Sequence, residues 1–247
     1  MKAARLLPLL LLPALLRAAP VAEGVLLPFR EVTVSSAVQG ILAAVNVREG
    51  DTVAAGTLLA TLIDRVEAAE VDRFAKVLEQ REFAAQGTQN LFRDQVVSEG
   101  EAIEKRIERD IAQLQHQIAL EQLDRRKIRS PIDGVVVEKK KEAGEAVDMN
   151  EAVFHLVDIS RVYLQVFIDA TEALKLKAGQ TVPVSFRDYQ AGTRNGTIDF
   201  IDPRIDGASG LVRIKVLIEN PDRKLIAGMR GSVTLAAASP APTPSSP

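Results

Sequence analysis

Hydrophobic and polar residues alternate in the last third of the chain, which is the period of a β-strand with one buried face. The pattern is clearest at Val162, Leu164, Val166 and Ile168. Further strands are expected at 182–186, 198–201, 212–218 and up to Leu235, with a helical connector at 171–177 and a turn at Asn195-Gly196. Five or so short strands with one helical interruption predict a small β-barrel over residues 159–236.

The middle of the chain, residues 65–128, has a helical period instead. It is rich in Ala, Glu, Gln, Lys, Arg and Leu and contains no proline within 66–126, and these residue types favour helix. One apolar seam comprises Val71, Phe74, Leu78, Ala85 and Phe92, interrupted by Arg81 and Thr88. The other comprises Ile103, Ile107, Ile111, Leu114 and Ile118. The two seams predict an antiparallel coiled-coil hairpin in which Leu78 and Ile111 are buried between the helices.

A repeat flanks this helical segment on both sides. Residues 36–64 align without a gap on residues 130–158, at a constant offset of 94. The aligned glycines are Gly40 with Gly134 and Gly50 with Gly144. Each copy is too short to bury a core alone, so we expect residues 34–64 and 129–158 to pack as one β-domain whose turns are formed at these glycines. The alternative is two unrelated β-meanders that match by chance.

The two ends of the chain differ from the rest. Lys2 and Arg5 precede an apolar run at 6–16, followed by small residues, which is typical of a cleaved signal peptide over residues 1–22. The run is too short to span a bilayer, and we expect the mature protein to begin near Glu23. The Pro- and Ser-rich residues 237–247 predict a disordered tail. The absence of cysteine excludes disulfides and a lipoprotein anchor.

Composition narrows the classes of function. The net charge of −2 offers no electrostatic signature of nucleic-acid binding. The two histidines, His116 and His155, have no neighbouring ligands in the sequence; we expect His116 on a solvated helix face and His155 to be structural. No nucleophile–base pattern or phosphate-binding loop is present. The sequence therefore predicts a protein that is not an enzyme and needs no cofactor or metal.

Several motifs, taken in order, resemble one protein family over residues 34–236. The first half-lipoyl motif corresponds to 36–42 and 47–53, the second to Ile128-Arg129-Ser130-Pro131-Ile132-Asp133-Gly134-Val135-Val136, and the barrel ending to 212–216, 219–222 and 225–229. With this combination the chain resembles the periplasmic adaptors, or membrane fusion proteins, of the hemolysin-secretion and RND efflux type. The fold class implied is mainly β, with a split half-lipoyl (barrel-sandwich hybrid) domain, an inserted helical hairpin and a small β-barrel.

The resemblance implies a mechanical function in the periplasm. Such adaptors link an inner-membrane transporter, of RND or ABC type, to an outer-membrane channel in a tripartite efflux or secretion pump, and they assemble as homo-oligomers, commonly hexameric rings. The chain ends its strands near Leu235, so it is expected to be a short adaptor without the membrane-proximal domain of many relatives.

The resemblance also assigns the channel contact to the tip of the hairpin. In many members an Arg, a Leu four residues later and a Ser seven residues after that occupy the tip; here Leu91 and Ser98 match, while Gly87 replaces the arginine. We therefore expect Leu91, Val97 and Ser98 to contact the channel. Ser98 is equally a candidate N-cap of the second helix.

Two other classes of protein are alternatives to an adaptor. Biotinyl or lipoyl carriers share the β-fold of the repeat, but they need a lysine at the junction of the two halves, and Asp64-Arg65-Val66 has none. A structural or scaffolding protein of the envelope, without a transport partner, is the other alternative. Co-precipitation with a transporter distinguishes it from an adaptor.

Overall fold

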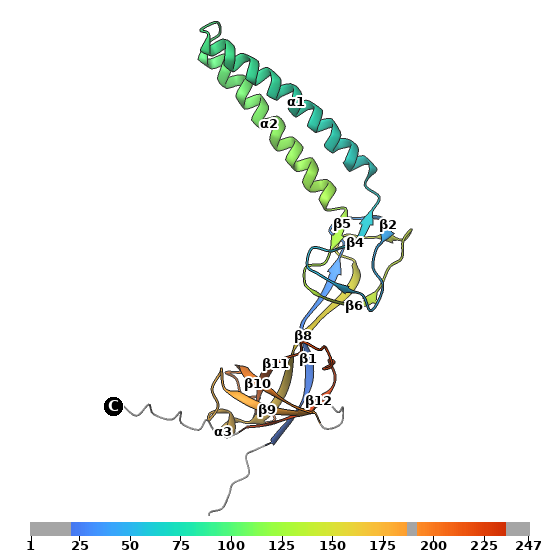
Figure 1. Ribbon diagram of the computed structural model, residues 1–247, viewed down its shortest axis with the longest axis vertical. Helices are drawn as coiled ribbons and strands as arrows, with labels where there is room; N and C mark the ends of the chain where they lie inside the picture. Colours follow the sequence, from blue (N-terminus) through green and yellow to red (C-terminus); the bar gives the residue numbers. More distant parts are fainter. Residues whose placement is uncertain (1–20, 187–191, 236–247) are drawn as a thin grey trace, which may run out of the picture. The chain divides into compact units, whose positions relative to one another are not determined.

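The computed structural model describes residues 21–186 and 192–235. The chain divides into two compact units, one formed by Pro28–Ser160 and the other by residues 21–27 together with 161–235. Strands β1 (Val21–Ser35) and β8 (Ala152–Asp169) contribute residues to both units. The first unit holds a β-domain interrupted by two long helices, and the second is a β-barrel (Figure 1). The predicted fold class is confirmed.

The β-domain of the first unit is built jointly from the two copies of the repeat. A four-stranded sheet has the order β5-β4-β2-β7, formed by Lys127–Arg129, Leu58–Leu62, Gly40–Val45 and Ala146–Val147. The pair of Gly40 with Val147 joins one copy to the other, and the pair of Leu58 with Arg129 joins the first copy to the segment just before the second. Strand β3 (Thr52–Val53) likewise pairs with β6 (Gly134–Lys139) of the second copy. Neither copy could form this core alone.

The four repeat glycines have two different structural roles. Gly50 and Gly144 lie in turns with φ of 90° and 93°, a conformation that glycine adopts at little cost. Gly40 and Gly134 are the first residues of β2 and β6 and are not turn residues. A Cβ at Gly134 would lie 2.6 Å from the Val157 carbonyl oxygen, and one at Gly40 would lie 2.7 Å from Leu62 Cδ2. The expectation of four turn glycines was therefore wrong for this pair, which allows close packing instead.

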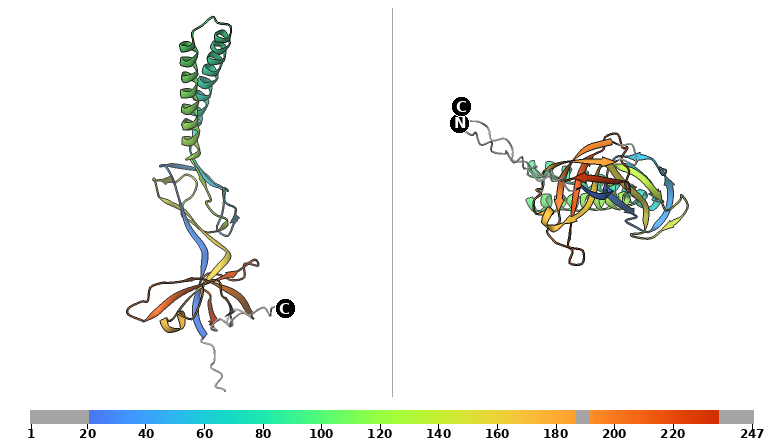
Figure 2. Two further views of the ribbon diagram at one scale, coloured as in Figure 1. Left: turned by 90° about the vertical axis from the view of Figure 1, so that its left-hand side faces the viewer. Right: turned by 90° about the horizontal axis from the view of Figure 1, so that it is seen from below.

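The two long helices are α1 (Arg65–Arg93) and α2 (Glu99–Asp124), and they lie side by side (Figure 2). The predicted seam of α1 is half-buried, Leu78 included. The predicted seam of α2 is wrong: Ile111 is 51% exposed and the four other members of the seam are also exposed. The buried residues of α2 are Ala102, Ala112 and Ala119. Both sets have helical spacing, so periodicity could not decide which one faces α1, and the smaller side chains allow the closer approach.

The second unit is a barrel of six strands in the order β1-β12-β9-β10-β11-β8, closed by pairing of β1 with β8. The strands not yet given are β9 (Thr181–Phe186), β10 (Gly192–Ile201), β11 (Leu211–Glu219) and β12 (Arg230–Thr234). The predicted inward faces of β8 and β11 are buried. A Cβ at Gly24 of β1 would lie 2.1 Å from the Gln165 carbonyl oxygen of β8, so glycine permits the closure.

Three expectations for the barrel need correction. Asn195-Gly196 is not a turn: β10 runs through it, and Gly196 pairs with Val182. Glycine is required there because a Cβ would lie 2.5 Å from Val216 Cγ1. The helical connector is a single turn, α3 (Ala170–Ala173). The sequence pattern predicts no strand before residue 34, yet β1 supplies the sixth strand of the barrel.

The assignments at the chain ends are only partly within the described residues. Strand β1 begins at Val21, so its first two residues fall inside the segment assigned to the signal peptide, and they pair with Thr234 and Val233. Residues 1–20 and the tail at 237–247 lie outside the described part of the chain. None of the helices in the described ranges is long and apolar enough to cross a membrane.

Candidate functional site

The tip of the helical hairpin is a short, ordered turn between α1 and α2. The backbone amides of Asp94, Gln95 and Val96 donate to carbonyls in the last turn of α1, and Gln95 adopts φ of 59°. Ser98 is the N-cap of α2, and its hydroxyl accepts a hydrogen bond of 3.3 Å from the Glu101 amide. Ser98 therefore has the capping role expected from the sequence. It is also exposed at the tip.

Apolar side chains are exposed around this turn. Leu91, in the last turn of α1, is 44% exposed, Val96 is 68% exposed and Val97 is half-buried. Sequence reasoning singled out Leu91 and Val97 but missed Val96 and also Phe83, which is 82% exposed. Phe83, Gly87 and Leu91 recur every fourth residue and so share one face of α1. A contact of these residues with a channel stays a prediction.

An exposed face of α2 carries an apolar stripe. Its members are Ile103, Ile107, Ile111, Leu114 and Ile118, all exposed. The spacing of four, four, three and four residues keeps neighbouring members of the stripe beside one another on the helix surface. Between Ile111 and Ile118 the flanking positions are the uncharged Gln113, Gln115 and Gln117, with the half-buried His116 on the opposite side. The stripe therefore has the pattern of a surface that packs on another helix.

The hairpin is attached to the β-domain through Arg126, just after α2. Its Nη1 donates to the Gln39 carbonyl oxygen at 3.0 Å, and its Nη2 forms an ion pair with Glu67 near the start of α1. Both side chains of the pair are mostly buried. A Cβ at Gly40 would lie 2.9 Å from Nη1. This contact joins both helices to the first copy of the repeat, and sequence analysis did not identify it.

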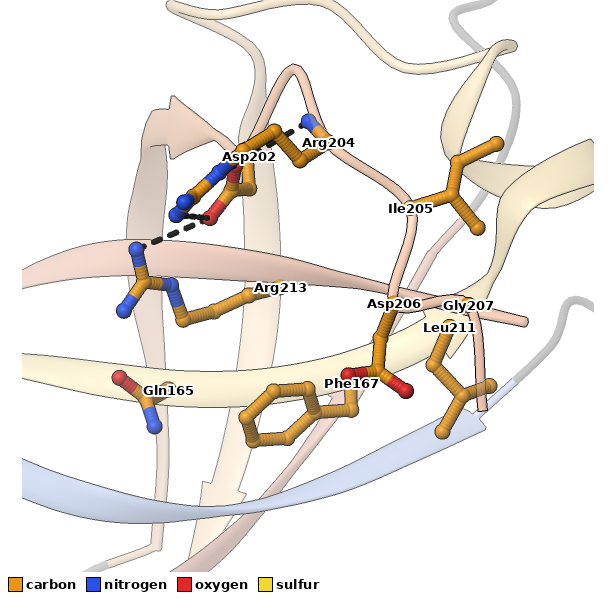
Figure 3. Close-up of a pocket in the computed structure, with 9 residues that line it drawn as sticks. All are labelled: Gln165, Phe167, Asp202, Arg204, Ile205, Asp206, Gly207, Leu211 and Arg213. Atoms are coloured by element: carbon orange, nitrogen blue, oxygen red, sulfur yellow. Dashed lines mark hydrogen bonds and ion pairs between the residues drawn. The ribbon is translucent and has the colours of Figure 1, made fainter. Parts of the chain in front are cut away.

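The barrel contains an open cleft of about 430 Å³ beside the loop between β10 and β11 (Figure 3). Asp202 accepts bonds from Arg204 Nε at 3.1 Å and Arg213 Nη2 at 2.9 Å. Mainly through hydrogen bonds from Arg204, the pKa of Asp202 is lowered from 3.8 to about 2. On another side of the cleft, Asp206 accepts bonds from Ser209 within its own loop. Asp202 and its two arginines therefore have the character of a structural ion-pair cluster that holds the loop.

The two histidines lie in different environments. His155 Nε2 lies 2.8 Å from Glu31 Oε1, and its Nδ1 lies 3.3 Å from the Thr33 hydroxyl. His116 is half-buried and shares its helix face with Ala112 and Ala119, so the expectation of a solvated face was wrong. Within the described ranges no three His, Cys, Asp or Glu side chains are grouped as a metal site would require.

Two family models match the chain in succession. The CzcB-like barrel-sandwich hybrid domain matches residues 30–158, and the CusB-like β-barrel domain matches residues 161–239. The hairpin lies within the first of these matches.

Curated relatives match over shared regions of moderate identity. The nodulation protein NolF of Rhizobium meliloti (strain 1021) is 24% identical over 220 residues, covering 83% of this chain and 60% of NolF. The efflux pump periplasmic linker BepD of Brucella suis biovar 1 (strain 1330) is 26% identical over 230 residues, covering 81% of this chain and 58% of BepD. The chain thus spans less than two thirds of the length of these relatives.

Solved structures share the fold. A chimera of MacA with the α-hairpin domain of Pseudomonas aeruginosa MexA has a TM-score of 0.75 at 24% identity, covering 89% of this chain and 79% of the chimera. The membrane fusion protein Spr0693 of Streptococcus pneumoniae R6 has a TM-score of 0.69 at 18% identity, covering 90% of this chain and all of Spr0693. At these identities the likeness concerns the fold alone.

Proposed function

The chain belongs to the membrane fusion protein family of efflux adaptors, and on that premise we propose that it links an inner-membrane transporter to an outer-membrane channel. The observation that carries this proposal is the order of the parts. A barrel-sandwich domain completed by two half-repeats holds a helical hairpin between them, and a β-barrel follows. BepD, similar over most of this chain, is named as an efflux pump periplasmic linker.

The proposed role is mechanical and not catalytic. The most perturbed carboxyl among the described residues, Asp202, is held by two arginines of its own barrel. A carboxylate with two cationic partners is a poor general base, because its proton affinity is low at neutral pH. The arrangement is suited to holding a loop in place, and we assign the chain no reaction and no cofactor.

We assign the channel contact to the hairpin tip, through Leu91 and Val97, with Ser98 fixing the start of α2. Exposed apolar side chains on an ordered turn favour a protein partner, because burying them releases water at little conformational cost. The boundaries that accompany this proposal are a signal peptide at 1–22, a β-domain at 34–64 and 129–158, a hairpin at 65–128, a barrel at 159–236 and a tail at 237–247. The proposed location is the periplasm.

We further propose that copies of the chain associate through their hairpins, as a ring in the assembled pump. The support is the exposed apolar stripe of α2, because packing against another helix would bury it. A second copy supplies such a helix at the same height, and between Ile111 and Ile118 the uncharged Gln113, Gln115 and Gln117 allow burial without unpaired charges.

The experiment removes the gene from the strain that encodes the protein and restores it as wild type, Leu91→Asp or the control Val66→Asp. Val66 is exposed at the other end of α1, so the control places the same charge on the same helix. Both variants should melt like the wild type, since exposed changes cost about 0.5 kcal/mol or less. Leu91→Asp should abolish export of toxic compounds, and Val66→Asp should retain it.

Co-precipitation from crosslinked cells distinguishes the adaptor from an envelope scaffold. An adaptor brings down both a transporter and a channel. Recovery of neither partner, together with normal resistance in the deletion strain, would contradict the proposal and favour the scaffolding alternative. Early melting of Leu91→Asp would show that Leu91 is a core residue and that the tip is misassigned.

A further inference from the structure

A groove lies between α1 and α2 in the half of the hairpin nearest the tip. Its volume is about 420 Å³, and Ala85 of α1 and Ala102 of α2 lie among its lining residues. Small side chains at these seam positions leave space between the helices. A smaller pocket of about 230 Å³, with Phe74 and Ala119 among its lining residues, lies between the same helices nearer the β-domain. The groove therefore follows from where the sequence places alanine in the seam.

The lining of this groove is cationic. Three arginines, Arg93, Arg106 and Arg109, line it together with a single acidic residue, Glu82. Arg109 is paired with the neighbouring Asp110. Arg93 and Arg106, in contrast, have neither an ion pair nor a side-chain hydrogen bond to any residue of the described chain. Two guanidinium groups at one groove are thus available to bind an anion.

The other lining groups indicate the kind of anion. Amide side chains, Gln89 among them, line the groove between the charges, and they can bind either a carboxylate or a peptide backbone. The exposed Leu91 and Val96 lie at the tip end of the hairpin. A ligand that uses all these features carries carboxylates beside an apolar residue. Arginine binds carboxylates in a bidentate, directional manner that specifies a partner.

We propose that this groove is a docking site for an acidic segment of a partner protein, with its carboxylates on Arg93 and Arg106. The inference rests on the proposed function, because it names the chemistry by which the hairpin end recognises its channel. The apolar tip residues supply contact area, and the two arginines supply orientation and selectivity. Association through this groove weakens with ionic strength, because exposed charge pairs are screened by salt.

The test exploits the absence of cysteine from the chain. A Gln89→Cys variant, expressed at native level, is labelled in intact cells with a benzophenone maleimide and irradiated. The crosslinked partner peptide is identified by mass spectrometry. The crosslinking yield from Gln89→Cys is then measured with two further pairs of substitutions. Arg93→Glu/Arg106→Glu changes the groove, and Arg48→Glu/Arg65→Glu is the control. The control makes the same change of charge at exposed positions outside the groove.

The expected result is a crosslink to a protein segment with at least two Asp or Glu residues. Its yield should fall at least tenfold in the groove variant and remain within twofold of wild type in the control, with unchanged melting temperatures for both. Reversing the acidic residues of that segment to Lys should restore the yield. Equal yields in the groove and control variants would overturn the proposal, as would a crosslink to lipid or to a segment without carboxylates.

A second labelled position separates this inference from the proposed function. Leu91→Cys, at the tip, should crosslink to the channel whether or not the groove is used. If Leu91→Cys crosslinks to the channel but Arg93→Glu/Arg106→Glu does not change the crosslinking yield from Gln89→Cys, the proposed groove site is refuted and the proposed adaptor function is not. No channel crosslink from either position would refute both.

Discussion

Isoleucine side chains are buried in the barrel but exposed on the second helix of the hairpin. In β11, Ile214 and Ile218 are at most 1% exposed, whereas Ile107 and Ile111 of α2 are 50% and 51% exposed. A closed barrel has an interior that accepts every second residue of each strand. A two-helix hairpin has only one internal seam, which here is filled by alanine on the side of α2. The comparison shows that an apolar pattern identifies a face, while the number of neighbouring elements decides whether that face is buried within the chain.

The largest expected effect comes from making one substitution in both regions. Ile214→Ala should lower the free energy of unfolding by about 2–5 kcal/mol, because it leaves a cavity in a closed core. Ile111→Ala removes the same atoms from a solvated face and should cost about 0.5 kcal/mol or less. Urea unfolding at low protein concentration measures both. Equal losses would mean that the stripe of α2 is buried within the single chain and would break the comparison.

Glycine to alanine exchanges should have opposite signs in the two regions. Gly24→Ala places a Cβ 2.1 Å from the Gln165 carbonyl oxygen, and it should destabilise the closure of the barrel by about 1–3 kcal/mol. Gly87→Ala adds a Cβ in open space on α1 and should stabilise the protein by about 0.5–1 kcal/mol through helix propensity. Thermal and urea unfolding of the purified variants test the pair. A stabilising Gly24→Ala would contradict the observed strand pairing.

Two ion pairs of the hairpin should contribute different amounts to the free energy of unfolding, because one is more buried than the other. Arg126→Gln removes a mostly buried pair with Glu67 and a bond to the Gln39 carbonyl, and it should cost about 1–3 kcal/mol. Arg81→Gln removes the more exposed pair with Glu108 and should cost about 0.2–1 kcal/mol. Hydrogen exchange should show faster opening at the base of the hairpin only for Arg126→Gln. If both variants lose equal stability, the attachment through Arg126 has been overestimated.

The smallest effect concerns acid sensitivity of the barrel. The folded pKa of Asp202 is about 2, below its ordinary value of 3.8. A lowered folded pKa contributes stability that is present above about pH 4 and is lost as the pH falls toward 2. Asp202→Asn should therefore flatten the decline of the unfolding free energy between these pH values. The control is Asp133→Asn, because the carboxyl of Asp133 accepts a bond from the Ala55 amide in the other unit. This control should leave the contribution of Asp202 in place. Parallel curves of unfolding free energy against pH for the wild type and Asp202→Asn would show that Asp202 does not cause the acid sensitivity.

Part of the candidate site was accessible from the sequence. The spacing of Leu91 and Ser98 placed both near the hairpin tip, and the N-cap preference of serine was visible beside Glu99 and Glu101. The groove was not accessible, because Arg93 and Arg106 belong to different helices and are separated by thirteen positions in the sequence. Only the antiparallel packing of α1 on α2 brings their charges to one cavity. The close approach of Arg126 to Gly40 was not accessible either, because these two residues are also far apart in the sequence.

What the sequence by itself determined was local and periodic: the alternation that buries Val212 to Ile218, the two long helices, and the repeat that makes one β-domain from two halves. These follow from side-chain period and turn chemistry, which act over a few residues. The tertiary structure alone decided which face of α2 meets α1, that Asn195-Gly196 continues a strand beside Val216, and that β1 closes the barrel. Each of these depends on the distance to an element far away in the chain, and a pattern within one segment does not contain that distance.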